Sequence, residues 1–146
     1  MLTTLFSTNN DVIGLILRMT VGFIIFPHGA QKMLGWFGGY GFTGTMGFFT
    51  GTAKLPYIIG LSVILLEFVG SLLLVAGLGT RLIALGFIGL MIGIIFTSHL
   101  QNGFFMNWFS NQSGEGFEYH LLIIGLAFAL LIGGAGKYSV DQLIVQ

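Results

Sequence analysis

Two charged residues, Arg18 and Glu67, lie in the middle of long apolar runs at positions 12–27 and 57–78. If these runs cross a lipid bilayer, an isolated charge at its centre costs roughly 3 to 17 kcal/mol. Residues of opposite sign relieve that cost by pairing, and the planar fork of arginine can hold a carboxylate with two hydrogen bonds. We therefore expect a direct Arg18–Glu67 ion pair. It either only fixes the packing of two helices, or it also lines a polar cavity or relays a proton.

Titratable side chains also gather where the apolar runs end. His28 and Lys32 close the first run one helical turn apart, His99 closes another, and Glu118 and His120 open the last. Imidazoles titrate near neutral pH, so this group could exchange protons at one mouth of a helical bundle. The structural alternative is that each histidine is satisfied by backbone or water at a helix end.

Metal chemistry has little support in the residue spacing. The chain has no cysteine, and its three histidines show neither HxxxH nor HxH spacing. We therefore expect no metal site. Haem ligation by His28 and His99 is not excluded, although no supporting motif accompanies it.

The elements that must position these residues are membrane helices. Of the 146 residues, 55% are hydrophobic and 7% are charged, against about 25% charged residues in soluble domains. The apolar runs predict spans at about 11–28, 56–78, 82–98 and 117–136, since each span needs about 20 residues. We expect one domain over residues 1–146, an all-α integral membrane four-helix bundle with two long interfacial loops on one side.

Those two loops, 29–55 and 100–116, contain Trp36 and Trp108, and indole rings prefer the depth of the lipid headgroups. The stripe Gly86, Gly89 and Gly93 is expected to serve helix packing alone. Lysine and arginine are balanced between the two sides. We favour cytoplasmic termini in a bacterial-type cytoplasmic membrane, because a functional lysine would inflate the count on the loop side. Zero net charge without a basic run argues against nucleic acid as a partner.

An ordered set of polar residues runs through nearly the whole chain. Arg18 precedes FPHGAQK, which ends the first span, and EFVGSLLLVAGLGTR lies in the second span. A histidine then ends the third span, a glutamate opens the fourth, and GAGKYSVD closes the bundle. From Arg18 to Asp141 this order resembles the DoxX family of small four-helix membrane proteins. The resemblance implies an association with membrane oxidoreductase systems, including quinone-reducing subunits and quinone detoxification.

This leads to the hypothesis of a membrane component of an oxidoreductase system that interacts with quinone in a polar-lined intramembrane site. Aromatic side chains, including 15 Phe, offer an apolar slot for the ring and tail. No residue is an obvious electron carrier, so the electrons should come from a soluble or membrane oxidoreductase partner, or from a bound flavin or haem. The candidate catalytic residues are His28, Lys32, Glu67 and Arg18, and the candidate cofactor-binding residues are His99, Glu118, Trp36 and Trp108.

Two alternatives of other classes stay open, and the sequence does not decide whether the protein is itself an enzyme. One is a non-enzymatic scaffold subunit that docks a partner oxidoreductase in the lipid bilayer. The other is a small-molecule or proton-coupled transporter. Four short helices leave little room for alternating access in a monomer, so a transporter would require a homo-oligomer.

Overall fold

The computed structural model describes residues 5–145, in which every regular element is helical. Helix α2 (Val12–Leu34) begins after Asp11, whose carboxylate accepts the N–H of Gly14 at 2.9 Å. It ends at Gly35, which adopts the left-handed conformation that glycine tolerates. Pro27 lies inside α2 without ending it, so the helix continues beyond His28, where the first span was predicted to end.

The second and third long helices each contain a π-helical turn, in which the main chain is wound less tightly than in an α-helix. In the second, α4 (Tyr57–Leu65) leads through the π turn η3 (Leu66–Gly70) into α5 (Ser71–Ala76). The third continues α6 (Thr80–Ile94) through the π turn η4 (Ile95–His99) and the 3-10 turn η5 (Leu100–Asn102).

The remaining elements complete the chain. Helix α7 (Glu118–Gly133) is the last long helix, and α8 (Val140–Val145) is short. The first predicted loop, 29–55, is largely helical. It contains the end of α2, the 3-10 turn η1 (Trp36–Gly38), α3 (Gly41–Gly47) and the π turn η2 (Phe48–Thr52).

Within residues 5–145, three helices are long and apolar enough to cross a membrane, namely Val12–Leu34, Tyr57–Ala76 and Thr80–Asn102. Their positions agree with the first three predicted spans. Helix α7 is apolar but shorter, at 16 residues. The bounds of the fourth predicted span therefore agree with a helix, while its crossing of the membrane stays a prediction.

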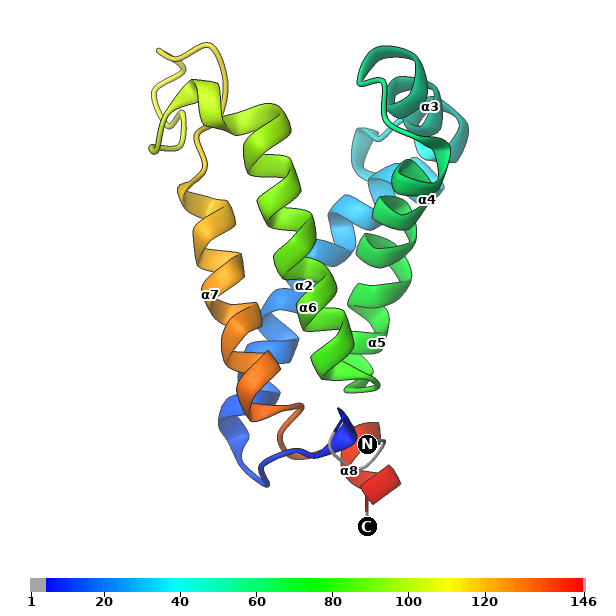
Figure 1. Cartoon of the computed structure of the whole chain (residues 1–146), viewed down its shortest axis with the longest axis vertical. Helices are drawn as coiled ribbons and strands as arrows, with labels where there is room; N and C mark the ends of the chain where they lie inside the picture. Colours follow the sequence, from blue (N-terminus) through cyan, green and yellow to red (C-terminus); the bar gives the residue numbers. More distant parts are fainter. Residues whose placement is uncertain (1–4, 146) are drawn as a thin grey trace.

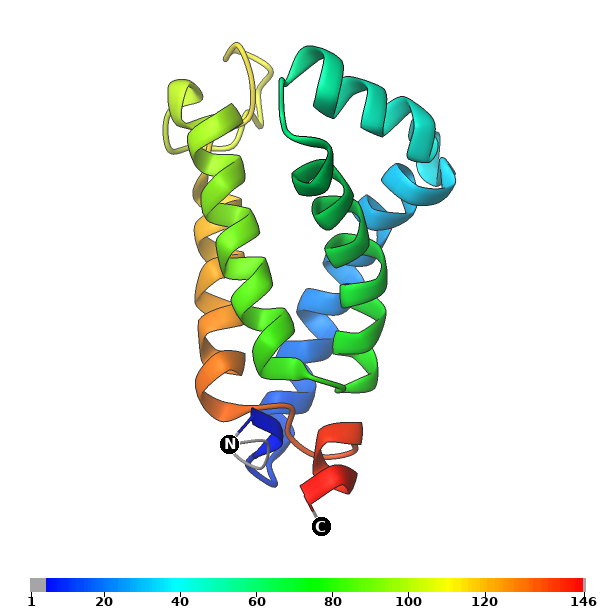
Figure 2. The same cartoon turned by 45° about the vertical axis from the view of Figure 1, so that its right-hand side comes forward.

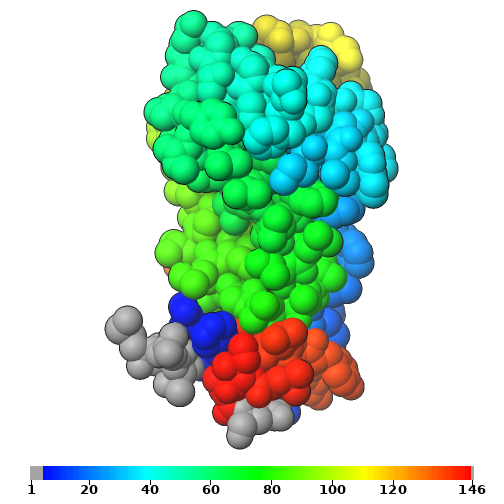
Figure 3. Space-filling model, turned by 90° about the vertical axis from the view of Figure 1, so that its right-hand side faces the viewer, coloured from blue at the N-terminus to red at the C-terminus, as the bar shows by residue number. Residues whose placement is uncertain are grey.

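The helices pack as two groups that meet at one end. Helices α6 and α7 lie side by side along their length, and α2 packs against η3 and α5 (Figures 1 and 2). The groups share a core that includes Val21, Leu74, Phe87, Ile123 and Leu130, all fully buried. Toward the end that carries α3, the ribbons of α4 and α6 separate. Figure 3 shows α3 and η2 over that end and the C-terminal segment over the other.

Arg18 lies at the end where the two groups meet, and its side chain binds main-chain carbonyls. Its Nε donates to Ala135 O at 3.0 Å, and its Nη2 donates to Tyr138 O at 2.7 Å and to Lys137 O at 3.1 Å. Its Nη1 donates to Val75 O, near the C-terminal end of α5. The residue is only 2% exposed. We call this set of hydrogen bonds the Arg18 clamp.

The predicted Arg18–Glu67 pair is therefore wrong. The last carbonyls of a helix lack intrahelical partners and favour a cation, as do the carbonyls of an irregular segment. Arg18 satisfies such groups at the end of α5 and in segment 135–138, so its donors are used without a carboxylate.

A buried carboxylate ties the same segment to another helix. Asp141 accepts the N–H of Gly79 at 2.6 Å and that of Thr80 at 2.9 Å, which caps the start of α6. Its own N–H donates to Gly77 O at 2.9 Å. The C-terminal segment therefore fixes α2, α5 and α6 together at this end of the bundle.

We expect Arg18→Met to lower the free energy of unfolding by at least about 2 kcal/mol, because each buried carbonyl left without a donor costs roughly 1–3 kcal/mol. Thermal or chemical unfolding in detergent micelles measures the change. Lys54→Met is the matched control, since it removes a cation from an exposed position. An Arg18→Met protein as stable as wild type would show that the Arg18 clamp does not hold the bundle together.

Candidate functional site

Glu67 lies in the π turn η3 and forms an ion pair with Lys32 of α2. Lys32 Nζ is 2.6 Å from Glu67 Oε2, and it also lies 3.5 Å from His28 O. The Glu67 side chain is 4% exposed and that of Lys32 is 25% exposed. The pair is therefore buried on the carboxylate side and accessible on the ammonium side.

Gly29 allows this pair to form by letting two main chains touch. A Cβ at Gly29 would lie 2.5 Å from the carbonyl carbon and oxygen of Glu67, which is closer than real Cβ contacts. Small residues permit such close helix contacts in membrane proteins. Because α2 continues past Pro27, Lys32 follows Gly29 by three residues and lies on the adjoining part of the same helix face.

Two histidines from the other pair of helices form a second polar group. The rings of His99 in η4 and His120 in α7 have centroids 4.4 Å apart. His99 Nδ1 is hydrogen-bonded to Glu115 O at 2.7 Å. His120 is 7% exposed, and its Nδ1 has no hydrogen-bond partner among the described residues. The buried hydroxyl of the adjacent Tyr119 also lacks a partner there.

Both polar groups line one cavity of about 750 Å³ between the two helix groups. Ligand pockets in proteins span about 300–1,000 Å³, with mostly apolar walls and a few polar groups. The apolar walls come from α4, α6 and η2, with residues such as Val63, Leu90 and Phe49. The charged and aromatic polar residues in the lining are His28, Lys32, Glu67, His99, Tyr119 and His120.

Each π turn among the described residues contributes to this cavity. Turn η2 supplies Phe48 and Phe49, η3 supplies Glu67, and η4 supplies His99. A π turn changes the direction in which the following side chains point, and such turns are frequent at functional sites. The cavity therefore lies where three helices depart from α-helical winding.

The structure brings together only part of the predicted site. His28, Lys32, Glu67 and His99 line the cavity, whereas Arg18 belongs to the clamp at the far end of the bundle. Sequence reasoning singled out His120 without assigning it to the site, and it missed Tyr119. The signal for Tyr119 was its position beside His120 at the start of an apolar helix.

Glu118 and the two tryptophans, which were predicted to bind a cofactor, lie outside the cavity lining. Glu118 Oε1 accepts the N–H of Met106 at 2.8 Å and holds the loop before α7. Leu122, one helical turn after Glu118 on the same face of α7, is 62% exposed, so this face does not point into the bundle. Trp36 and Trp108 are 53% and 79% exposed.

The predicted packing role of the α6 glycines holds for Gly86 only. A Cβ at Gly86 would lie 3.1 Å from the side chain of Leu66. A Cβ at Gly89 or Gly93 would meet no heavy atom within 4 Å, and both glycines line the cavity. These two positions leave space open instead of bringing helices into contact.

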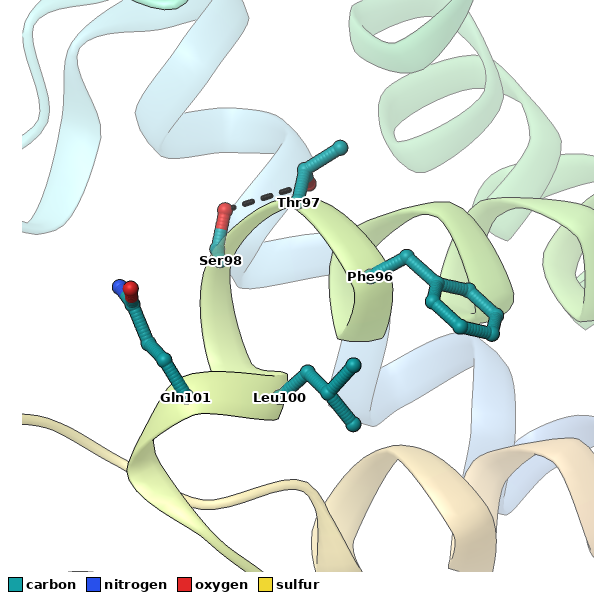
Figure 4. Close-up of a pocket in the computed structure, with 5 residues that line it drawn as sticks. All are labelled: Phe96, Thr97, Ser98, Leu100 and Gln101. Atoms are coloured by element: carbon teal, nitrogen blue, oxygen red, sulfur yellow. Dashed lines mark hydrogen bonds between the residues drawn. The ribbon is translucent and has the colours of Figure 1, made fainter.

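A second hollow of about 260 Å³ lies along the extension of α6 and shares Thr97 and Ser98 with the larger cavity. Its lining comes from the single segment 96–101, in which Thr97 is hydrogen-bonded to Ser98 (Figure 4). Residues of one segment do not converge as those of the larger cavity do. Within residues 5–145, no group of three or more His, Asp and Glu side chains is placed to hold a metal ion.

The fold is that of a helical integral membrane protein, in which the part described by the structure has three helices long enough to span the bilayer. The DoxX family model matches residues 13–100, and the chain belongs to this family. It is 33% identical over 116 residues to a Bacillus subtilis (strain 168) protein named "Putative oxidoreductase CatD", which covers 80% of this chain and 76% of that relative. No solved structure matches the chain.

A double-mutant cycle tests the Lys32–Glu67 pair. Lys32→Met leaves a buried carboxylate without its cation, and breaking such a pair costs up to about 3–5 kcal/mol, less where one partner is partly exposed. We expect Lys32→Met with Glu67→Gln to be more stable in thermal unfolding than Lys32→Met alone. If the changes in the free energy of unfolding of the two single variants simply add in the double variant, the two residues do not form a direct pair.

Proposed function

We propose that the cavity binds a quinone, and that the protein is the quinone-interacting membrane component of an oxidoreductase system. The observation that carries this proposal is the pair of buried polar atoms without partners, Tyr119 Oη and His120 Nδ1, in the lining residues of a largely apolar cavity. Buried polar groups are normally hydrogen-bonded. A ligand with polar oxygens on an apolar ring would satisfy them.

The donors of the cavity suit the two carbonyl oxygens of a quinone. Lys32 and Tyr119 are both lining residues of the cavity, and apolar side chains of α4 and α6 line it as well. Glu67 holds Lys32 in place through the 2.6 Å ion pair. An ammonium that is held in this way can donate a charge-assisted hydrogen bond to a ligand oxygen.

A bound quinone would supply the redox chemistry by accepting two electrons and two protons. The residues of this chain would bind and orient it, and they would move protons. The Lys32–Glu67 pair and the His99–His120 pair are titratable groups at the cavity wall. The electrons would come from a partner oxidoreductase or from a flavin or haem that the partner system holds. The oxidoreductase name of the Bacillus subtilis relative supports this assignment.

The membrane arrangement that we propose makes α7 the fourth span of a four-helix bundle. The exposed apolar residues Leu122, Phe128 and Ile132 of α7 would face lipid. Trp36 and Trp108 would lie at headgroup depth on the side of the cavity. The described residues near both termini lie at the opposite end of the bundle, where Gln142 Nε2 is 3.3 Å from Asn10 Oδ1, and we place that end in the cytoplasm.

The experiment is to purify the protein in mild detergent from cells that make quinones and to quantify extracted quinone by mass spectrometry. We expect bound quinone in the wild type. Tyr119→Phe, which removes only one hydroxyl, should weaken binding roughly two- to tenfold, as expected for the loss of one hydrogen bond.

Tyr138→Phe is the matched control, because the same hydroxyl is removed from a side chain that is 83% exposed. It should bind quinone as the wild type does. Wild-type protein that retains no quinone and binds none when it is added would contradict the proposal. It would favour a scaffold that docks a partner oxidoreductase.

A further inference from the structure

The cavity has an open side between α4 and α6. Gly89 and Gly93 line it from α6, both are exposed, and neither has a heavy atom within 4 Å of a Cβ position. Ile59 and Val63 of α4 line the cavity from the facing helix. Side chains at the two glycine positions would occupy this space, so glycine keeps it free.

This opening lies within the membrane-spanning part of both helices. At 1.5 Å per residue, Gly89 and Gly93 lie about 14 and 20 Å along the helix from Thr80, in a span that runs to Asn102. The exposed residues on the neighbouring helix surfaces include Ile59, Ile92 and Phe96, which are 48%, 42% and 70% exposed. An opening bordered by apolar side chains at this depth faces lipid, not water.

The lining of the cavity is apolar at this opening and more polar at the inner walls. The ion pair of Lys32 with Glu67 comes from α2 and η3, and His120, more than nine-tenths buried and without a partner for Nδ1, comes from α7. Phe48 and Phe49 of η2 line the cavity, and α3 and η2 cover this end of the molecule in Figure 3. Polar groups therefore lie at the inner walls and the apolar opening lies opposite α2.

We infer that Gly89 and Gly93 form the α6 side of a lipid-facing entrance. The ligand then carries a long apolar tail that leaves the cavity between α4 and α6. The inference rests on the proposed function for the identity of the ring. When the ring enters the cavity laterally from the bilayer, the rest of the tail stays in lipid and keeps its apolar contacts. Gly89 and Gly93 are thus specificity-determining residues that select a long-tailed ligand.

The test compares a quinone that carries a polyprenyl tail with the same ring lacking the tail. Gly89→Leu and Gly93→Leu should weaken binding of the tailed quinone at least about tenfold, because each leucine would occupy the opening and exclude the part of the tail that passes between α4 and α6. Lost contact of about two methylene groups of that part suffices for a tenfold change. Binding of the tail-less ring should change less than about twofold, which is within the effect of a neutral substitution. Equilibrium binding to purified protein in lipid nanodiscs measures both.

Gly125→Leu of α7 is the matched control, because Gly125 is also exposed with open space around it but lies outside the cavity lining. It should bind both quinones as the wild type does. If the Gly89 and Gly93 variants bind the tailed quinone like wild type, the inference is overturned and the proposed function stands. If wild type binds neither quinone, the proposed function itself fails.

A second measurement does not depend on the folding of any variant. A photoreactive group placed on the tail near the ring should cross-link wild-type protein within residues 57–65 and 86–96. Cross-links confined to the loop at 103–117 would place the tail at the membrane surface, and they would overturn the lipid-facing entrance.

Discussion

The contact between Gly29 and the main chain of Glu67 is the constraint on which the cavity depends. Any side chain at position 29 would overlap the carbonyl group of Glu67 and force α2 away from η3. Lys32 would then lose its 2.6 Å contact, and a buried carboxylate would be left without a cation. The same contact keeps α2 packed against η3 and α5, while α6 packs against α7. The cavity occupies the space that this division leaves between α4 and α6.

The two intramembrane charges of opposite sign serve different ends of the molecule. Arg18 joins α2 to the end of α5 and to the segment after α7, where its donors are used by carbonyls. Glu67 holds Lys32 beside His28 in the cavity lining. Stability at the closed end and polar chemistry in the cavity therefore depend on separate residues. A change in one need not disturb the other.

Hydropathy was enough to predict the long helices, because a run of about 20 apolar residues has the length that a helix needs to cross a bilayer. It could not predict which charges pair. Arg18 and Glu67 were placed at similar depth, but the direction in which each side chain points depends on packing. Lys32 was a nearer partner because α2 continues past Pro27. Similarly, the pattern Gly86, Gly89 and Gly93 is the same whether glycine permits contact or leaves space, so only the neighbouring helices distinguish the two.

The acceptors of Arg18 have a consequence for how this protein can vary among relatives. Every residue type carries the same carbonyl group, so substitutions at the half-buried Lys137 and the exposed Tyr138 leave their hydrogen-bond acceptors intact. Gly136 between Ala135 and Lys137 is confined to glycine, because its φ is 73° and a Cβ there would lie 2.6 Å from Leu15 N. The arginine alone supplies the donors. The family model covers Arg18 but ends at residue 100. The side chains of two acceptor residues, Lys137 and Tyr138, can therefore vary without loss of the interaction, while the donor is confined to a single residue.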